Sequence, residues 1–306
     1  MIKEEYSYND ISSYLMSTID LLISGEFNNE ERCAFFYNEF INNNKQILAL
    51  NLEERNILYS KLFVDNHANA NQHGEISTFL PLLLRKNYIS QKNILLDLTS
   101  LDHVTIMTII NILINKVHPK KLFAGYITPK KYIESLDNYN NSLPVRMDGI
   151  MTIPGLAHIE KPSESVCAFL GFEGGRFQRI IELVKDANNI FPIYAIPLIN
   201  PHWLKVSMWN SLDFLNTNIS SYIINKCPAE SVFDALNLLR DISTRTINTV
   251  LVPLGTRPHS ASCAIFASNN KNTRIIYDYA TETKYRTEGI GKIYIYNLTK
   301  FINLKR

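Results

Sequence analysis

Short apolar runs alternate with longer amphipathic stretches along the chain from about residue 93 onward. The longer stretches have the spacing of helices, and the apolar runs are continuous, which is typical of strands buried on both faces of a sheet. The runs that predict strands are Ile94–Leu98, Leu122–Ile127, Val166–Phe172, Ile190–Ile196, Thr249–Leu254, Arg274–Tyr279 and Lys292–Tyr296. This alternation predicts the α/β fold class, with a mainly parallel, Rossmann-like sheet flanked by helices.

The first 90 residues follow a less regular pattern. Residues 8–23 and 75–85 have helical spacing, whereas residues 32–40 and 46–50 fit a helix or a strand. We therefore predict an N-terminal helical or mixed layer over residues 1–90 that packs on the sheet.

Residues 91–306 are predicted to form the Rossmann-like, ligand-binding domain. One irregular stretch within it, Leu136–Lys161, is expected to be a lid or a long connection over the pocket, because structureless segments of that length are usually functional or mobile.

The composition indicates a folded protein with a weak overall electrostatic field. The chain has 306 residues, of which 46% are hydrophobic and 20% charged, so it can bury a sizeable core. Its formal net charge of +2 arises from 31 basic and 29 acidic side chains, which excludes global attraction to nucleic acid or to an anionic membrane. A local basic groove stays open as an alternative.

The cysteines indicate a reducing compartment. Cys33, Cys167, Cys227 and Cys263 are far apart and lack the C-x-x-C spacing of a zinc site, so we expect unpaired thiols. The N-terminus lacks the apolar core of a signal peptide, and no apolar run has the length of about 18 residues that a spanning helix needs. We expect a cytoplasmic protein that does not enter the membrane.

The strongest candidate for chemistry is the turn that follows the predicted strand Thr249–Leu254. Gly255 lets backbone N–H groups approach an anion, the following helix start favours negative charge, and Arg257 adds a bidentate phosphate donor. Together with Thr256, these residues predict a pocket for a phosphorylated or otherwise anionic nucleotide. The alternative is a tight turn with Arg257 as a solvated rim residue.

A second glycine-rich turn follows Val166–Phe172. Gly174 and Gly175 permit close approach of a ligand, and Glu173 and Arg176 offer an acceptor and a donor at its rim. Glu173 is also a candidate general base if burial raises its pKa. The alternative is a local ion pair between Glu173 and Arg176.

Polar residues also follow the predicted strand Ile94–Leu98. Thr99 and Ser100 are candidate phosphate contacts, although Ser, Thr and Asp102 at this place are expected for helix capping alone. Asp97 lies inside the apolar run and is costly to bury without a partner. If the strands before the three turns are parallel neighbours, the turns converge on one edge of the sheet.

His259 is a second candidate acid or base, with a polar wall residue as the alternative. The histidines lack metal-ligand spacing, so no catalytic metal and no cofactor are predicted. The phosphate-loop, GxGxxG and G-x-S-x-G motifs are absent, which argues against a P-loop ATPase, an ordinary NAD dehydrogenase and a serine hydrolase. Trp203 and Trp209 could stack on bases, or pack in the core or on a partner surface.

The segment 249–280, with Gly255-Thr256-Arg257-Pro258 between a strand and a small-residue helix, resembles the CARF-type Rossmann domains of prokaryotic defence. Those domains bind cyclic oligoadenylates and often carry a Gly-Thr-Lys turn here; Arg257 replaces the lysine and keeps the charge. In that family the sensor usually precedes a C-terminal effector such as a ribonuclease. Because only about 25 residues follow residue 280, the resemblance implies an N-terminal effector or a separate effector protein.

These observations lead us to expect a sensor or regulatory protein that binds a nucleotide or another phosphorylated small molecule, in prokaryotic antiviral defence. One alternative is a hydrolase or transferase that acts on a nucleotide or glycosidic bond, with Glu173 or His259 as acid or base. Another is a non-catalytic subunit of a larger assembly. A homodimer is compatible with the sequence, which does not decide the oligomeric state.

Overall fold

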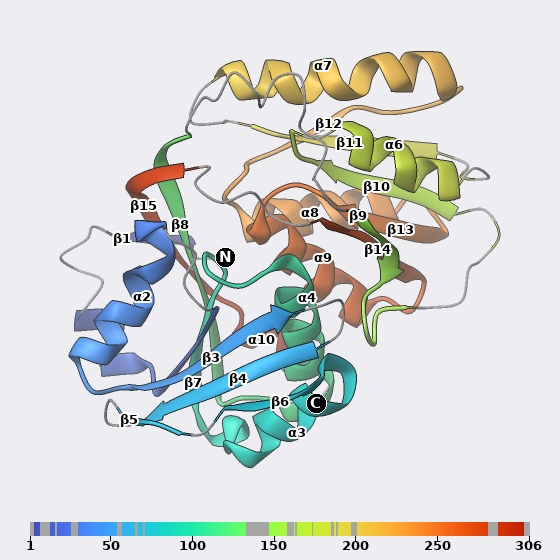
Figure 1. The fold of residues 1–306 in the computed structure, drawn as a ribbon. Helices are drawn as coiled ribbons and strands as arrows, with labels where there is room; N and C mark the ends of the chain where they lie inside the picture. The colour runs from blue at the N-terminus through green and yellow to red at the C-terminus, as the bar shows by residue number, and fades with distance from the viewer. Residues whose placement is uncertain are drawn as a thin grey trace. The chain divides into compact units, whose positions relative to one another are not determined.

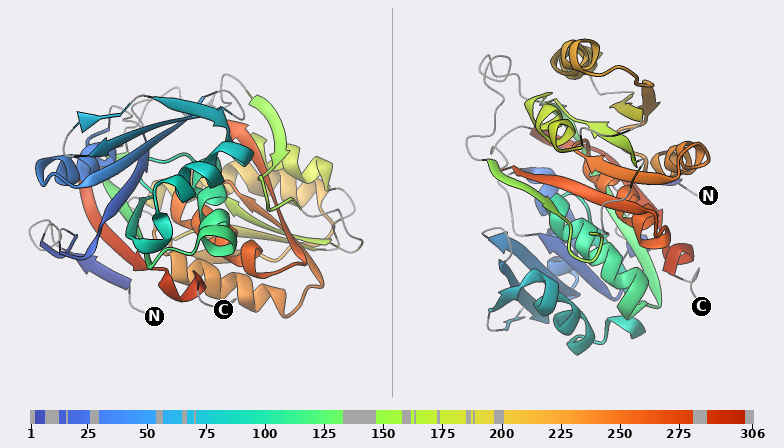
Figure 2. Two further views of the ribbon diagram at one scale, coloured as in Figure 1. Left: turned by 90° about the horizontal axis from the view of Figure 1, so that it is seen from below. Right: turned by 90° about the vertical axis from the view of Figure 1, so that its right-hand side faces the viewer.

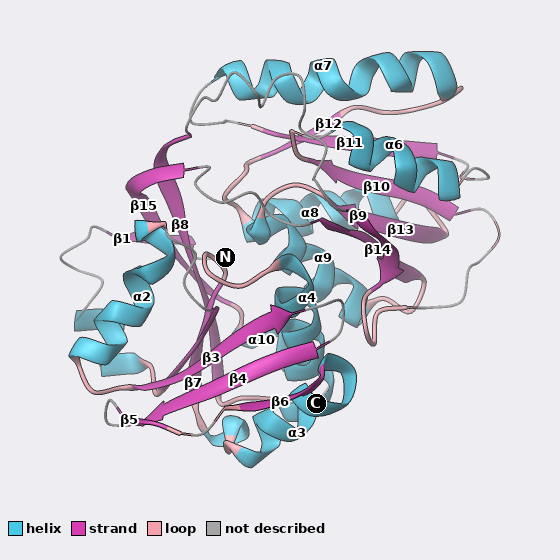
Figure 3. Cartoon of the chain, in the orientation of Figure 1, coloured by secondary structure: helices cyan, strands magenta, loops and turns pink. Residues whose placement is uncertain are grey.

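The computed structural model describes the fold of most of the chain. The described residues are 3–6, 13–15, 17–25, 30–53, 57–64, 67–69, 71–132, 147–157, 162, 164–172, 174–184, 187, 189–196, 201–280 and 287–302. Strands, helices and loops are distinguished by colour in Figure 3.

The chain divides into two compact units. Unit 1 combines Met1–Ile133 with Lys284–Arg306, and unit 2 is Glu134–Thr283 between them. These boundaries differ from the predicted division at residue 90. The reason is a long-range pairing, because the strand Leu21–Gly25 from the first 90 residues pairs with the strand Asn93–Asp97.

Unit 1 is built on one mixed sheet with helices on both faces (Figure 1). Its strands are β1 Lys3–Tyr6, β2 Leu21–Gly25, β3 Gln46–Glu53, β4 Ile57–Val64, β5 His67–Ala68, β6 Gln72–Glu75, β7 Asn93–Asp97, β8 Lys121–Tyr132 and β15 Thr287–Asn297. Its helices are α2 Glu31–Asn42, α3 Ile76–Lys86, the 3-10 turn η1 Ile89–Gln91, α4 His103–Ile112, the π-helical turn η2 Leu113–Val117 and α10 Thr299–Ile302.

The strand order of unit 1 is β1-β15-β8-β7-β2-β3-β4-β5, with β6 paired to β4. The centre, β8-β7-β2-β3, is parallel, and the outer strands pair antiparallel. Helix α2 covers one face, where Phe36 and Phe40 are fully buried in a cluster with Ile47 and Leu95. The chain leaves β2 toward β3 on one side and returns to β7 and β8 on the other, so the strand order reverses between β2 and β7.

Unit 2 has a six-stranded sheet between two layers of helices. Its strands are β9 Met147–Thr152, β10 Glu164–Leu170, β11 Asn189–Ala195, β12 Asn225–Cys227, β13 Asn248–Pro253 and β14 Thr273–Ala280. Its helices are α6 Gly174–Leu183, α7 Pro201–Asn218, α8 Val232–Ser243 and α9 Arg257–Asn269.

The strand order of unit 2 is β12-β11-β10-β13-β14-β9, in which only β9 is antiparallel. The parallel strands therefore follow the doubly wound Rossmann order, and the order reverses between β10 and β13. Both of these strands are buried along their whole length. Figure 2 shows α6 and α7 on one face of this sheet and α8 and α9 on the other.

The predicted α/β, Rossmann-like class is confirmed, and each apolar run predicted as a strand overlaps one. The helix predicted over residues 8–23 is wrong at its end, because Leu21–Gly25 forms strand β2, buried at every position. The predicted connection 136–161 contains strand β9, which adds an antiparallel edge beside β14. Residues 133–146 and 158–161 lie outside the described part of the chain.

Candidate functional site

The carboxyl ends of β10 and β13 lie side by side at the reversal of strand order in unit 2. Gly171 follows β10, and Leu254 and Gly255 follow β13. A Cβ on Gly171 would lie 2.6 Å from the carbonyl oxygen of Leu254, so the two turns contact each other through their backbones. The predicted convergence of these two turns is confirmed. In open α/β sheets, ligands bind at such a switch point.

Helix α9 begins at this switch point without a cap from the side chain of its N-cap residue. Thr256 occupies the N-cap position in an extended conformation, but its side chain accepts no bond from the first turn of the helix. Its hydroxyl donates instead to the carbonyl of Ala229, in the loop that precedes α8. The backbone N–H groups of the first turn therefore lack the cap that a Thr usually supplies, and such a helix start favours an anion.

Arg257 is the first residue of α9 and is partly exposed, as is Gly255 beside it. Pro258 follows within the first turn, where its missing N–H costs no helical hydrogen bond. Gly255, Thr256 and Arg257 therefore bring a glycine, a helix N-terminus and a guanidinium to three consecutive positions of this turn.

His259 is fully buried behind the turn. Its Nε2 lies 2.9 Å from the carbonyl oxygen of Pro228, so Nε2 carries the proton and donates it, and Nδ1 is a bare acceptor. The ring packs on Phe169 at 4.6 Å between centroids. Desolvation lowers the pKa of His259 to about 4, and the imidazole is therefore neutral at physiological pH.

The Nδ1 atom of His259 has no hydrogen-bond partner among the described residues. A Cβ built on Gly255 would lie 2.8 Å from it, so glycine is the residue that leaves room for the imidazole at this turn. A buried acceptor without a donor is unfavourable, and a hydroxyl or amino group beside Gly255 would satisfy it.

Arg176 turns away from the predicted rim position. Its Nε lies 3.3 Å from Asp278 Oδ2, one of its terminal nitrogens donates to the Asp278 carbonyl at 2.9 Å, and its guanidinium lies 5.3 Å from the centre of the Tyr277 ring. Only about a tenth of its side chain is exposed. Arg176 therefore links α6 to β14, with Asp278 as its partner.

Gly174 lies against helix α7. A Cβ on it would lie 1.9 Å from the carbonyl oxygen of Asn210, so its close approach is to protein backbone. The side chains of Ser207 and Asn210 donate to the carbonyls of Gly171 and Phe172 at 2.6 and 2.7 Å, which fixes the loop after β10. Gly175 is partly exposed in the first turn of α6, and Glu173 lies outside the described residues.

Thr99 and Ser100 do not follow a strand of the unit 2 sheet. They follow β7, which is a strand of the unit 1 sheet, whereas β10 and β13 belong to unit 2. The expectation that all three turns converge on one sheet edge is therefore wrong, because the apolar runs that precede them pair into two sheets.

The hydroxyls of Thr99 and Ser100 are bonded within unit 1. Ser100 donates to Asp97 Oδ2 at 2.6 Å and accepts from the Gly25 N–H at 2.8 Å, and Thr99 Oγ1 accepts from the Ile127 N–H at 3.0 Å. Asp97 Oδ1 accepts from the Thr99 N–H at 2.8 Å. Burial raises the pKa of Asp97 to about 6 despite these bonds. This network ties β2, β7 and β8 together.

Sequence reasoning missed the partners that hold the unit 2 turns. The carbonyls of Pro228 and Ala229 anchor the start of α9, and they carry no side-chain signal. Asp278 had a signal, because a carboxylate inside the apolar strand segment Ile275–Tyr279 requires a buried partner.

The described residues contain no group of three or more His, Cys, Asp and Glu side chains that could hold a metal ion. All four cysteines are buried free thiols, and desolvation raises the pKa of Cys227 to about 12, so the thiol is protonated and unreactive at neutral pH. Among the described residues, no helix is both long and apolar enough to cross a bilayer.

Comparison with protein-family models and with curated proteins finds no match for this chain.

Proposed function

We propose that unit 2 binds the phosphate or another anionic group of a nucleotide-like ligand at the carboxyl ends of β10 and β13. The observation that carries this proposal is the start of α9, which lies at a topological switch point and whose N-cap residue Thr256 does not cap the first turn with its side chain. Its N–H groups and its dipole attract an anion there. Gly255 admits the close approach, and Arg257 supplies a fork of donors that matches phosphate.

His259 supports a ligand that carries a donor next to its anionic group. The bare Nδ1 beside Gly255 accepts from a hydroxyl or an amine, and it repels an anion. A sugar phosphate with a neighbouring hydroxyl, or a base amino group, fits both requirements. Arg176 shapes this end of the sheet through its ion pair with Asp278.

A sensor or regulatory role follows better from these residues than turnover does. A neutral imidazole with a pKa of about 4, buried and bonded to Pro228, is a poor general acid at neutral pH. The resemblance of residues 249–280 to CARF-type domains supports ligand sensing in prokaryotic antiviral defence, with an effector protein as the partner that receives the signal.

Isothermal titration calorimetry with nucleoside monophosphates, nucleoside triphosphates and cyclic oligonucleotides tests the proposal. We expect one class to bind, and R257A to weaken its affinity at least tenfold, because a charge-assisted fork is lost. R240A is the matched control: Arg240 is exposed on α8 in the same unit. No heat with any of these ligands, or equal affinity in R257A, would contradict the proposal. Product formation that disappears in E173Q while binding persists would instead favour the enzyme.

A further inference from the structure

Helix α7 is oriented with hydroxyl groups toward its own unit. Among residues 204–218 of this helix, the buried positions are Ser207, Ser211 and Leu215, which follow one another at four-residue spacing. Trp209, two residues from the buried serines, is 77% exposed and is among the most exposed large apolar side chains of the described residues. This arrangement departs from the usual amphipathic pattern, because two of the three buried positions are serines and the largest apolar side chain is exposed.

The hydroxyls of Ser207 and Ser211 form hydrogen bonds within unit 2, which explains why they are buried. Ser207 donates to the Gly171 carbonyl, and Ser211 Oγ lies 2.7 Å from the hydroxyl of the buried Tyr194. These bonds fix the rotation of α7 about its axis. As a consequence, Trp209 lies on the outer surface, flanked by the partly exposed Val206 and Leu212.

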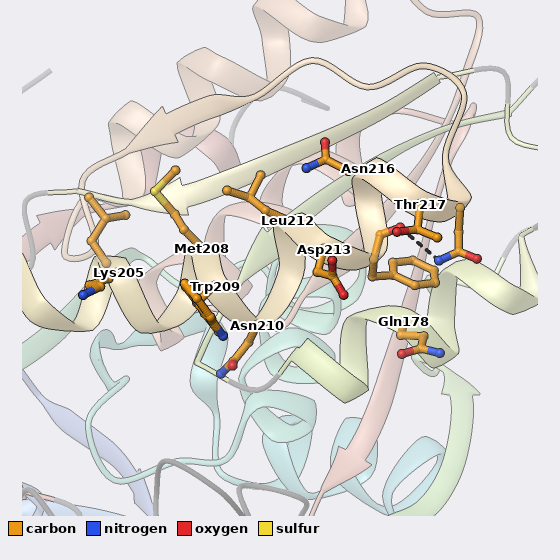
Figure 4. Close-up of a pocket in the computed structure, with 12 residues that line it drawn as sticks. Gln178, Lys205, Met208, Trp209, Asn210, Leu212, Asp213, Asn216 and Thr217 are labelled. Carbon is orange, nitrogen blue, oxygen red and sulfur yellow. Dashed lines mark hydrogen bonds between the residues drawn. The ribbon is translucent and has the colours of Figure 1, made fainter.

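A groove of about 1040 Å³ follows α7 and includes Gln178 of α6 in its lining. Figure 4 shows Lys205, Trp209 and Asp213 following one another along one side of α7, with Met208 and Leu212 on the adjoining side. Within the part of the chain that the structure describes, neither Lys205 nor Asp213 forms an ion pair.

The outer residues of α7 are self-complementary about Trp209. Lys205 precedes Trp209 by four residues and Asp213 follows it by four, while Val206 and Leu212 lie three residues before and after it. If two copies of α7 cross antiparallel on a twofold axis at Trp209, each Lys205 meets Asp213 of the partner subunit. Each Val206 then meets Leu212 of the partner subunit. A twofold interface requires this kind of pattern, in which one patch complements itself.

We propose that the chain forms a twofold-symmetric homodimer through α7, with Trp209 at the centre of the interface. Lys205 and Asp213 set the antiparallel direction of the two helices, because a parallel crossing would place like charges opposite each other. A nucleic-acid strand fits less well, since Asp213 beside Trp209 repels phosphate and cancels the charge of Lys205. This inference is independent of the ligand proposed for the switch point.

Charge reversal tests the direction of the helices. Sedimentation equilibrium of the full chain should show a monomer–dimer equilibrium, with the dimer dissociation constant raised at least tenfold in K205D and in D213K. The double variant K205D/D213K restores opposite charges across the axis and should return to within about threefold of wild type. K116D, at an exposed position of unit 1, should leave the equilibrium unchanged.

Truncation of the central residue tests the position of the axis. W209A should raise the dimer dissociation constant about 100-fold, because a central tryptophan is the usual energetic anchor of an interface. I247S is the control, at a side chain of unit 2 that is 75% exposed. W209C, at a protein concentration above the dimer dissociation constant of W209A, should form an intermolecular disulfide under mild oxidation, because the axis brings the two positions together. The native cysteines are buried and do not compete.

Several outcomes overturn the proposal. A chain that is monomeric at high micromolar concentration has no such dimer, and its α7 surface then serves a different partner. A dimer that W209A leaves intact uses another face. A double variant K205D/D213K that is as weak as the single variants shows that Lys205 and Asp213 do not face each other.

Discussion

In both units, a glycine lets two turns pack against each other where the strand order reverses. The units differ in the polar groups that surround this contact. In unit 1, Gly25 at the end of β2 packs against the backbone of Ser100 after β7. In unit 2, Gly171 after β10 packs against the backbone of Leu254 after β13. A glycine lets the two turns approach at backbone distance in both sheets.

The difference lies in how the polar groups after the second strand are satisfied. In unit 1, Asp97 binds Thr99 and Ser100, and Asp102 caps α4 by accepting from the Thr105 N–H at 2.8 Å. In unit 2, the side chain of Thr256 does not cap the start of α9, and the His259 acceptor that faces Gly255 has no donor among the described residues. A switch point is therefore a place where a ligand can bind, and the local side chains decide whether the protein fills it itself.

The largest expected effect is an opposite response of the two units to acid. Burial raises the pKa of Asp97 from 3.8 to about 6, so unit 1 gains stability as pH falls through 6 toward 4. Burial lowers the pKa of His259 from 6.5 to about 4, so unit 2 keeps its stability above pH 6.5 and loses it as pH falls toward 4. Each difference in pKa corresponds to about 3 kcal/mol.

Hydrogen exchange of peptides from β7 and from α9, measured between pH 4 and 7 and corrected for intrinsic rates, follows each unit separately. D97N should remove the acid stabilisation of unit 1 alone, and H259Q the acid destabilisation of unit 2 alone. Parallel responses in the two peptides would contradict the contrast.

The glycines are expected to matter in both units, with a larger effect in unit 1. A Cβ on Gly25 would lie 2.2 Å from the Ser100 oxygen, closer than the 2.6 Å between a Cβ on Gly171 and the Leu254 oxygen. Because the obstacle is backbone in each case, G25A should lower the free energy of unfolding by about 3 kcal/mol and G171A by about 2 kcal/mol. G175A, in the first turn of α6, is the control and should be neutral or slightly stabilising. Urea titrations measure the differences, and wild-type stability in G25A would show that the turns can move apart.

The sequence predicts the helices and strands that have a clear local pattern of apolar residues. It does not predict the strands that form only because they pair with other strands. Continuous apolar runs such as Val166–Phe172 predict strands correctly, because a strand buried on both faces has no polar positions. The first three residues of strand β2 were predicted as the end of a helix, since they directly follow a segment with helical spacing. Strand β12 is three residues long and two of them are polar, which leaves no periodic signal.

The same limit applies to the candidate site. Gly255, Thr256 and Arg257 are consecutive, so the sequence shows their association directly. The ion pair of Arg176 with Asp278 joins residues 102 positions apart, and only the strand order brings them together. The assignment of Thr99 to the same sheet edge as Gly255 was wrong for that reason, because apolar runs predict strands without saying which strands share a sheet.

The smallest effect on stability is expected when the N-cap of α4 is removed. Removing that cap and introducing one at α9 also tests the comparison most directly. D102A should lower the free energy of unfolding by about 1 kcal/mol, the usual value of an N-cap side chain. T256D introduces at α9 the carboxylate that α4 already has, and it should compete with an anion for the same N–H groups. We expect the anion affinity of T256D to fall at least tenfold in calorimetry with the nucleotide that binds wild type.

The control for T256D is T256S, which retains the hydroxyl that donates to Ala229 and should bind like wild type. Both Thr256 variants must be compared at equal folded fraction, because T256D also loses this hydrogen bond. Undiminished nucleotide affinity in T256D would mean that the anion does not bind at the start of α9. The two switch points would then differ in how they are capped without differing in what they bind.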